Sequence, residues 1–376
     1  PFSRGGDGKA ALGPVLREYL LGEAMHAMGV PTTRALAAVT TGEQVRRDTM
    51  LPGAVLCRVA ASHVRVGTFE LFAARREHTR VQQLAEYVIQ RHFPALLGRD
   101  DRHLGLLREV AARQAALVAR WMNLGFIHGV MNTDNMAISG ETLDYGPCAF
   151  MEGYDPMAVF SSIDHDGRYA YVNQPVIARW NLARLAETLL PRLADDPARA
   201  LAMATAVIDE FPALYAAELL RGQRAKLGLQ QAHAGDAALA EGWLDLLAAS
   251  AVDFTLAWRH LADAAAGDPA PLRALFPGDP APLATWLARW HDRLAAEAGD
   301  PHARAQAMRA VSPWIIPRNH RVEEALAAAV QRDDLEPFTR LLAAIQRPFT
   351  ADPALAALAE PAPPELTARY QTFCGT

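Results

Sequence analysis

The stretch His128-Gly-Val-Met-Asn-Thr-Asp134-Asn135, followed by Asp144-Tyr145-Gly146, carries most of the information about the fold. Each part leads into a short apolar, β-like run, and Asn135 and Asp144 are nine positions apart. We expect a hairpin to bring these two side chains to one cation. Amide and carboxylate oxygens suit Mg²⁺ or Mn²⁺ held between protein and phosphates. Asp and Asn also form ordinary turns, which is the alternative interpretation.

Protein kinases hold their metal with an Asn of the catalytic loop and the Asp of a D-F-G sequence. When the kinase pattern H-R-D-x-x-x-x-N is laid on this chain, His128 and Asn135 match their positions. The position of the catalytic base is occupied by Val130, which cannot accept a proton. An acid stands instead at Asp134. The pattern predicts a metal site, together with either a dead kinase or a transfer geometry served by Asp134.

The first 70 residues predict one helix and a small sheet. Apolar spacing indicates a helix over residues 12–28, ended by Gly29 and Pro31. Two β-rich runs follow, over 35–40 and 54–66, and a turn at Thr41–Gly42 is expected to join them as a hairpin. Residues 70–124 read as mostly helical, 155–174 as a loop, and nearly everything after Pro175 as helices separated by Pro-bearing breaks. The fold class is therefore α+β.

Four further polar features of this first region are candidate nucleotide contacts. Glu18 lies on the predicted helix, where a kinase presents a Glu that pairs with a Lys. Arg58 and Arg65 lie in or beside a strand and have the planar fork that suits phosphate oxygens. All but two of the 37 basic residues are arginines, so an arginine alone is a weak signal. The segment around Asp7 and Gly8 can bring backbone N–H groups to a phosphate.

Composition narrows the class of protein. The 376 residues are 51% hydrophobic and 21% charged, which excludes wholesale disorder. A net charge of −5 argues against a nucleic-acid binder. The sequence contains no run of about 18 uncharged apolar residues, so we expect no membrane span. The three cysteines, Cys57, Cys148 and Cys374, form no CxxC pair, so we expect the reducing cytoplasm. The composition is compatible with a monomer.

The chain resembles the selenoprotein O family, whose members are kinase-like protein adenylyltransferases. The resemblance extends over almost the whole chain, and its most specific part is HGVMNTDN together with DYGP. The matching stretches are PFSRGGDGKAAL (1–12), LREYLLGEAMHAMGVPTTRAL (16–36), HGVMNTDNMAI (128–138), LDYGPCAFMEGYDP (143–156), DHDGRYAYVNQP (164–175), MRAVSPWIIPRNH (308–320) and TFCGT (372–376).

The resemblance implies a pseudokinase fold with a partial N-lobe over 1–75, a C-lobe core over 76–195 and a helical extension over 196–376. It implies that ATP binds in a flipped orientation and that AMP passes to Ser, Thr or Tyr hydroxyls of proteins, with release of pyrophosphate. UMP transfer with Mn²⁺ has also been attributed to bacterial members. The site residues that it implies are Asp134 as proton acceptor, Asn135 and Asp144 as ligands of Mg²⁺ or Mn²⁺, Asp7, Gly8, Arg58, Arg65 and Asp144 as nucleotide contacts, and Glu18 as the Glu of the helix ion pair.

Two departures from the family pattern shape our expectations. The family carries a Gly-rich loop and a strand Lys upstream of PFSR, so we expect the chain to be part of a longer protein and to bind ATP poorly alone. Some members join a C-terminal Cys to a Cys of the activation segment, where this chain has Ser161. Cys57 and Cys148 are then the only internal partners for Cys374. A kinase and a non-catalytic ATP-binding scaffold remain the alternative functions.

Overall fold

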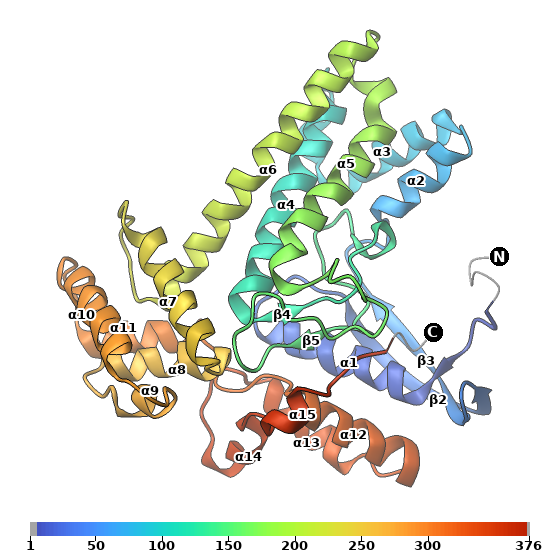
Figure 1. Ribbon diagram of the computed structural model, residues 1–376. Coiled ribbons are helices and arrows are strands. Elements are labelled where there is room, and N and C mark those ends of the chain that lie inside the picture. The colour runs from blue at the N-terminus through green and yellow to red at the C-terminus, as the bar shows by residue number, and fades with distance from the viewer. Residues whose placement is uncertain (1–5, 374–376) are drawn as a thin grey trace.

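The computed structural model describes residues 6–373, an α+β arrangement with a small sheet and many helices (Figure 1). The sheet has three antiparallel strands in the order β1 (Ala10–Ala11), β3 (Met50–Val59) and β2 (Arg34–Arg46). Helix α1 (Leu12–Ala27) follows β1 directly and packs against the sheet. This confirms the helix expected over 12–28, which ends where Gly29 takes a positive φ of 78°.

The hairpin of β2 and β3 differs from its prediction. Pairing continues past Thr41–Gly42 to Arg46, and the turn lies at residues 47–49. Gly42, with φ of 74°, falls where the register shifts between Thr40 and Gln44. A glycine at positive φ serves a turn and a bulge equally, so the predicted turn position was wrong.

The second predicted β-run is also shorter than expected. Strand β3 ends at Val59, and residues 60–65 leave the sheet. Arg65 instead forms an antiparallel bridge with Ala137, and helix α2 (Val66–Ala74) starts at once. The N–H of Val66 donates to Met136 O and the N–H of Ile138 donates to Val64 O, both at 3.0 Å, so residues 64–66 pair with the loop that contains Asp134.

The region between α2 and residue 150 positions the motif of the sequence. Long helices lead to the two-residue strand β4 (Phe126–Ile127), which pairs antiparallel with β5 (Ala149–Phe150). The β-like run 148–150 is therefore confirmed as a strand, whereas the run 136–138 makes only the bridge of Ala137. Residues 128–148 form one loop between β4 and β5.

An aromatic cluster fixes the base of this loop. The ring of Phe126 lies 5.4 Å from Phe150, 5.6 Å from Trp121 and 6.1 Å from Tyr145, centroid to centroid. All four side chains are fully buried. Burial of such large rings contributes most of the local packing energy, so the loop starts and ends on a rigid base.

The remaining helices confirm the Pro-bearing breaks. Five of them begin at or next to a proline of a predicted break: α6 (Pro197–Lys226), α9 (Ala270–Ala274), α10 (Ala281–Ala295), α11 (Pro301–Arg309) and α15 (Pro364–Thr367). Late helices return to the N-terminal region, where α12 and α13 pack on α1, below it in Figure 1. The helices not yet bounded are α3 (His78–His92), α4 (Arg102–Leu124), α5 (Gln174–Leu193), α7 (Asp236–Ser250), α8 (Phe254–Ala265), α12 (Asn319–Arg332), α13 (Glu336–Ile345) and α14 (Ala356–Ala359).

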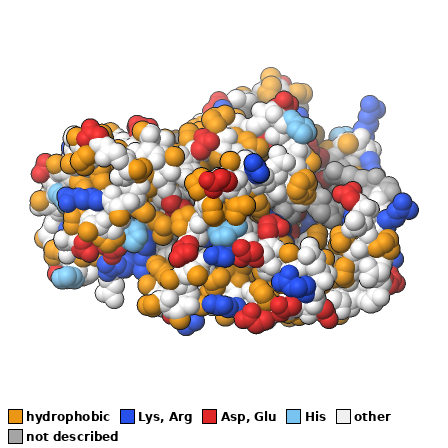
Figure 2. Space-filling model, turned by 60° about the horizontal axis from the view of Figure 1, so that its bottom comes forward, with side chains coloured by type: hydrophobic (Ala, Val, Ile, Leu, Met, Phe, Trp, Pro, Cys, Tyr) orange, Lys and Arg blue, Asp and Glu red, His pale blue; other side chains and the backbone are white. Residues whose placement is uncertain are grey.

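Among the described residues one helix, α6, is long and apolar enough by composition to cross a membrane. Core helices of soluble proteins share this length and composition. Asp209 interrupts the apolar run of α6 and pairs with Arg179 of α5 at 2.5 Å. Figure 2 brings forward the bottom of the molecule as drawn in Figure 1, and on this face acidic and basic side chains are interspersed with apolar ones.

Candidate active site

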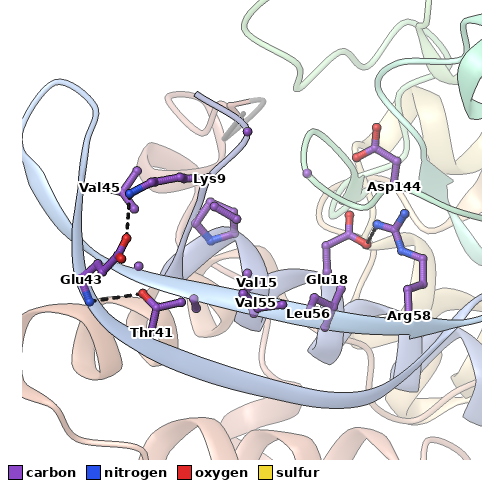
Figure 3. Close-up of a pocket in the computed structure, with 16 residues that line it drawn as sticks. Lys9, Val15, Glu18, Thr41, Glu43, Val45, Val55, Leu56, Arg58 and Asp144 are labelled. Carbon is purple, nitrogen blue, oxygen red and sulfur yellow. Dashed lines mark hydrogen bonds and ion pairs between the residues drawn. The ribbon is translucent and has the colours of Figure 1, made fainter. Parts of the chain in front are cut away.

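A cavity of about 470 Å³ lies between α1, the β2–β3 hairpin and the Asp144 turn. Figure 3 shows its two polar ends, with Glu18, Arg58 and Asp144 at one and the ion pair of Lys9 and Glu43, 2.7 Å long, at the other. Apolar side chains of α1 and β3 lie between the two ends. Residues from three separate parts of the sequence therefore meet in one hollow.

Glu18 connects the three elements that form this end of the cavity: α1, β3 and the Asp144 turn. Its Oε2 accepts a hydrogen bond from Nη2 of Arg58 at 2.6 Å, and its Oε1 accepts one from the backbone N–H of Tyr145. Burial raises the pKa of Glu18, Arg58 opposes the shift, and the nearby charge of Asp144 adds to it. The ion pair of the helix Glu is thus made with Arg58, while Lys9 pairs with Glu43.

Asp144 has an unusual backbone conformation for a residue that is not glycine. Its φ is 68°, in the left-handed region that Asp and Asn enter more readily than other side chains. Hydrogen bonds fix the chain on both sides, since Nε2 of His128 binds Leu143 O at 3.0 Å and Glu18 holds the N–H of Tyr145. The neighbouring structure therefore determines where the Asp144 carboxylate lies.

Hydrogen bonds within the loop hold the side chains of His128 and Asn135. His128 is fully buried, and burial lowers the pKa of its ring. Its Nδ1 accepts the N–H of Val130 at 3.4 Å, so the neutral ring braces the loop. Asn135 donates from Nδ2 to Val130 O at 3.0 Å, which leaves Oδ1 as the atom suited to a cation.

Arg65 and Asp134 meet at the start of α2. Nη1 of Arg65 donates to the backbone oxygen of Asp134 at 2.9 Å. Burial and the charge of Arg58 lower the pKa of Arg65, whereas the charges of Asp134, Asp144 and Glu18 act in the opposite direction. Arg65 therefore interacts electrostatically with Arg58, Asp134, Asp144 and Glu18, the other charged residues predicted for this end of the site.

The Asp134 carboxylate rests against the first turn of α2. A Cβ added to Gly67 would lie only 2.2 Å from Oδ1 of Asp134, far inside contact distance. Gly67 therefore makes room for this carboxylate. We expect Gly67→Ala to displace the Asp134 carboxylate; a displacement of about 1 Å lowers the rate of a reaction that uses such a group by roughly a hundredfold.

Single-turnover kinetics would measure this effect. The matched control is Gly242→Ala in α7, where an added Cβ meets Trp286 at an ordinary 3.6 Å. That variant should retain the wild-type rate. Equal rates for Gly67→Ala and Gly242→Ala would show that the reaction rate does not depend on the position of the Asp134 carboxylate.

The remaining predicted contacts lie at the other end of the cavity. Gly8, with φ of 69°, lines it, whereas Asp7 is not a lining residue. Asp7 accepts a hydrogen bond from Arg47 at 3.0 Å and one from the N–H of Lys9, and these lower its pKa. Lys9 and Glu43 are lining residues that sequence reasoning did not select. The signal was present for Lys9, which is one of only two lysines in the chain.

The cavity lining is acidic in balance. It carries the carboxylates of Glu18, Glu43 and Asp144 against the cations of Lys9 and Arg58. A polyphosphate entering it needs additional positive charge. No group of three or more His, Cys, Asp or Glu side chains able to hold a metal exists within residues 6–373. The carboxylate of Asp144 and the amide oxygen of Asn135 are hard oxygen donors, the type that suits Mg²⁺ or Mn²⁺.

The cysteines in the described part of the chain are both free. Cys57 is exposed, and Cys148 is buried, which raises the pKa of its thiol to about 12. Cys374 falls outside the described residues. Two residues before it, Thr372 forms a parallel bridge with Ser161, which lies in the loop where the family resemblance places the activation segment.

Comparison with known proteins identifies the class to which this fold and cavity belong. A family model described as "Protein adenylyltransferase SelO" matches residues 1–346. The chain is 60% identical over its whole length to "Protein nucleotidyltransferase YdiU" of Chromobacterium violaceum, of which it covers 79%. It is 57% identical to the protein of that name from Bradyrhizobium and 60% identical to one from Cereibacter sphaeroides, covering 76% of each.

The chain therefore belongs to the SelO family of protein adenylyltransferases. Its reaction class is nucleotidyl transfer to proteins, with a nucleotide as one substrate and a protein as the other.

Proposed function

We propose that this chain transfers AMP from ATP to Ser, Thr or Tyr hydroxyls of proteins, with Mg²⁺ or Mn²⁺, and releases pyrophosphate. The observation that carries the proposal is the meeting of Glu18, Arg58 and Asp144 in one cavity, with Arg65 and Asp134 beside it. Val130, at the place of a kinase base, has no group that accepts a proton. A transfer served by Asp134 accounts for both features.

In the proposed reaction, the substrate hydroxyl oxygen forms a bond to the α-phosphorus of ATP. The bond from that phosphorus to the β-bridging oxygen breaks, and pyrophosphate leaves. Asp134 accepts the hydroxyl proton, for which it must lie within hydrogen-bond distance of the incoming oxygen. The guanidinium groups of Arg58 and Arg65 bind phosphate oxygens.

Asn135 and Asp144 would hold the metal, which supplies neutralisation of phosphate charge. The acidic balance of the lining supports this assignment, because the protein alone presents too little positive charge for a triphosphate. Positioning and charge neutralisation provide most of the acceleration in phosphate transfers.

The arrangement of elements supports a kinase-like fold. A small sheet carries α1 with its Glu, and a largely helical region bears the loop of Asn135 and the Asp144 turn. In this proposal residues 1–75 are a partial N-lobe, 76–195 the core of the C-lobe and 196–376 its helical extension. We place the enzyme in the cytoplasm as a monomer, and the free thiols of Cys57 and Cys148 support a reducing compartment.

The choice of nucleotide is tested by offering ATP or UTP to the natural full-length protein with a Ser-, Thr- and Tyr-containing protein substrate. We expect one pyrophosphate released for each protein-bound AMP, and faster modification from ATP than from UTP. Mass spectrometry locates the adduct. Modification from UTP alone would contradict AMP transfer while leaving nucleotidyl transfer in place, and modification without pyrophosphate would contradict both.

A further inference from the structure

Arg17 lies on α1 next to Glu18 and is buried, although no part of the proposed reaction uses it. Its guanidinium binds the backbone that follows Asp144. Nε donates to Tyr145 O at 3.1 Å and to Gly146 O at 2.9 Å, and Nη2 donates to Cys148 O at 2.5 Å. One side chain thus holds three carbonyl oxygens within four residues of Asp144.

The C-terminal region holds Arg17 from its other side. Nη1 pairs with Oε1 of Glu323 of α12 at 3.1 Å, and the hydroxyl of Tyr370 lies 3.5 Å from Nη2. Tyr370 in turn donates to Glu323 at 3.1 Å. These partners are more than 300 residues from Arg17 in sequence. They orient the guanidinium toward the Asp144 turn.

Thr372 binds the one carbonyl of this turn that Arg17 does not. Its Oγ1 donates to Pro147 O at 2.5 Å. The backbone of Thr372 is itself held by two hydrogen bonds. Its N–H donates to Phe160 O at 2.8 Å, and its carbonyl oxygen accepts the N–H of Ser162 at 2.9 Å. All four carbonyl oxygens of residues 145–148 are therefore bound by Arg17 or by Thr372.

We infer that Arg17 is a positioning residue for Asp144, and that Glu323, Tyr370 and Thr372 make the C-terminal region part of the active site. The inference rests on the proposed function, in which Asp144 binds the metal. Asp144 stands at φ of 68°, a conformation that persists only where the surroundings determine it. Arg17 provides most of those surroundings on the C-terminal side of the turn.

The test variant is Arg17→Lys, which keeps the charge and loses the planar fork that reaches several carbonyls together. The readout is Mn²⁺ binding in the presence of a non-hydrolysable ATP analogue. The electron paramagnetic resonance signal of free Mn²⁺ monitors this binding. We expect Mn²⁺ affinity to fall at least tenfold, while binding of the analogue without metal stays within twofold. A role in folding alone would lower the melting temperature and leave Mn²⁺ affinity unchanged.

The matched control is Arg34→Lys. Arg34 also forms an ion pair with α1, through two hydrogen bonds of 2.6 and 2.8 Å to Glu23, but it binds no part of the Asp144 turn. The Mn²⁺ affinity of the Arg34→Lys variant should equal that of the wild type. If Arg17→Lys does not fold, Glu323→Gln removes one anchor of Arg17 and should weaken Mn²⁺ binding about threefold.

The outcomes separate the two claims. Wild-type Mn²⁺ affinity in Arg17→Lys, or in Glu323→Gln where the first variant does not fold, would overturn the role of Arg17 and leave the proposed function standing. A wild-type protein that binds Mn²⁺ no better with the analogue than without it would overturn the metal site itself, and the inference with it.

Discussion

Asp144→Asn is expected to abolish metal-dependent nucleotide binding and to slow transfer about a thousandfold, equivalent to about 4 kcal/mol. The reason is the state of the carboxylates in the cavity. Glu18 is paired with Arg58 and Glu43 with Lys9, whereas Asp144 makes no ion pair within the described residues. Its charge is the one most available to a cation.

The Asn substitution suits this test because Asn also tolerates positive φ, so the turn keeps its backbone. Asp333→Asn is the matched control, since Asp333 also has positive φ, 53°, and ends α12 but is not a lining residue of the cavity. Nucleotide affinity is measured with and without Mg²⁺ or Mn²⁺. Metal-dependent binding that survives in Asp144→Asn would remove Asp144 from the site.

The second large effect is expected at Asp134. Asp134→Asn should lower the single-turnover transfer rate by roughly 10²- to 10⁴-fold, the range typical of a lost general base. Nucleotide binding should change much less, because Asn has nearly the same shape and leaves the contact with Gly67 and the backbone bond from Arg65 in place. The two effects are therefore separable.

Rate and affinity must be measured independently for this variant, with Asp333→Asn again as the control. A rate loss that exceeds the affinity loss at least tenfold supports the role of base. If both fall by the same factor, Asp134 binds nucleotide and does not accept the proton.

Sequence reasoning could predict the parts of the site that depend on local pattern. The helix that carries Glu18 follows from apolar spacing. The structure places Glu18 and Asp144, which the kinase comparison selected, in one cavity with Arg58. Their roles in binding and catalysis stay predictions. In the segment around Asp7 and Gly8, Gly8 lines the cavity, whereas Asp7 pairs with Arg47 and is not a lining residue.

Other features depend on contacts between distant parts of the chain. Gly42 is compatible with a turn or a bulge, and only the pairing of β2 with β3 decides between them. Arg17 is one arginine among many until α12 and the C-terminal end of the chain fold back on α1. Its partners Glu323 and Tyr370 have no periodic or motif signal that connects them with the Asp144 turn.

The most direct test of nucleotidyl transfer is to incubate the natural full-length protein with Mg²⁺ or Mn²⁺ and ATP labelled at either the α- or the γ-phosphate. The account predicts protein-bound label from α-labelled ATP only, with the γ-label recovered in pyrophosphate. Protein-bound label from γ-labelled ATP only would mean a kinase whose base lies elsewhere. No bound label from either, with ATP still bound, would mean a non-catalytic scaffold, and either result would contradict the account.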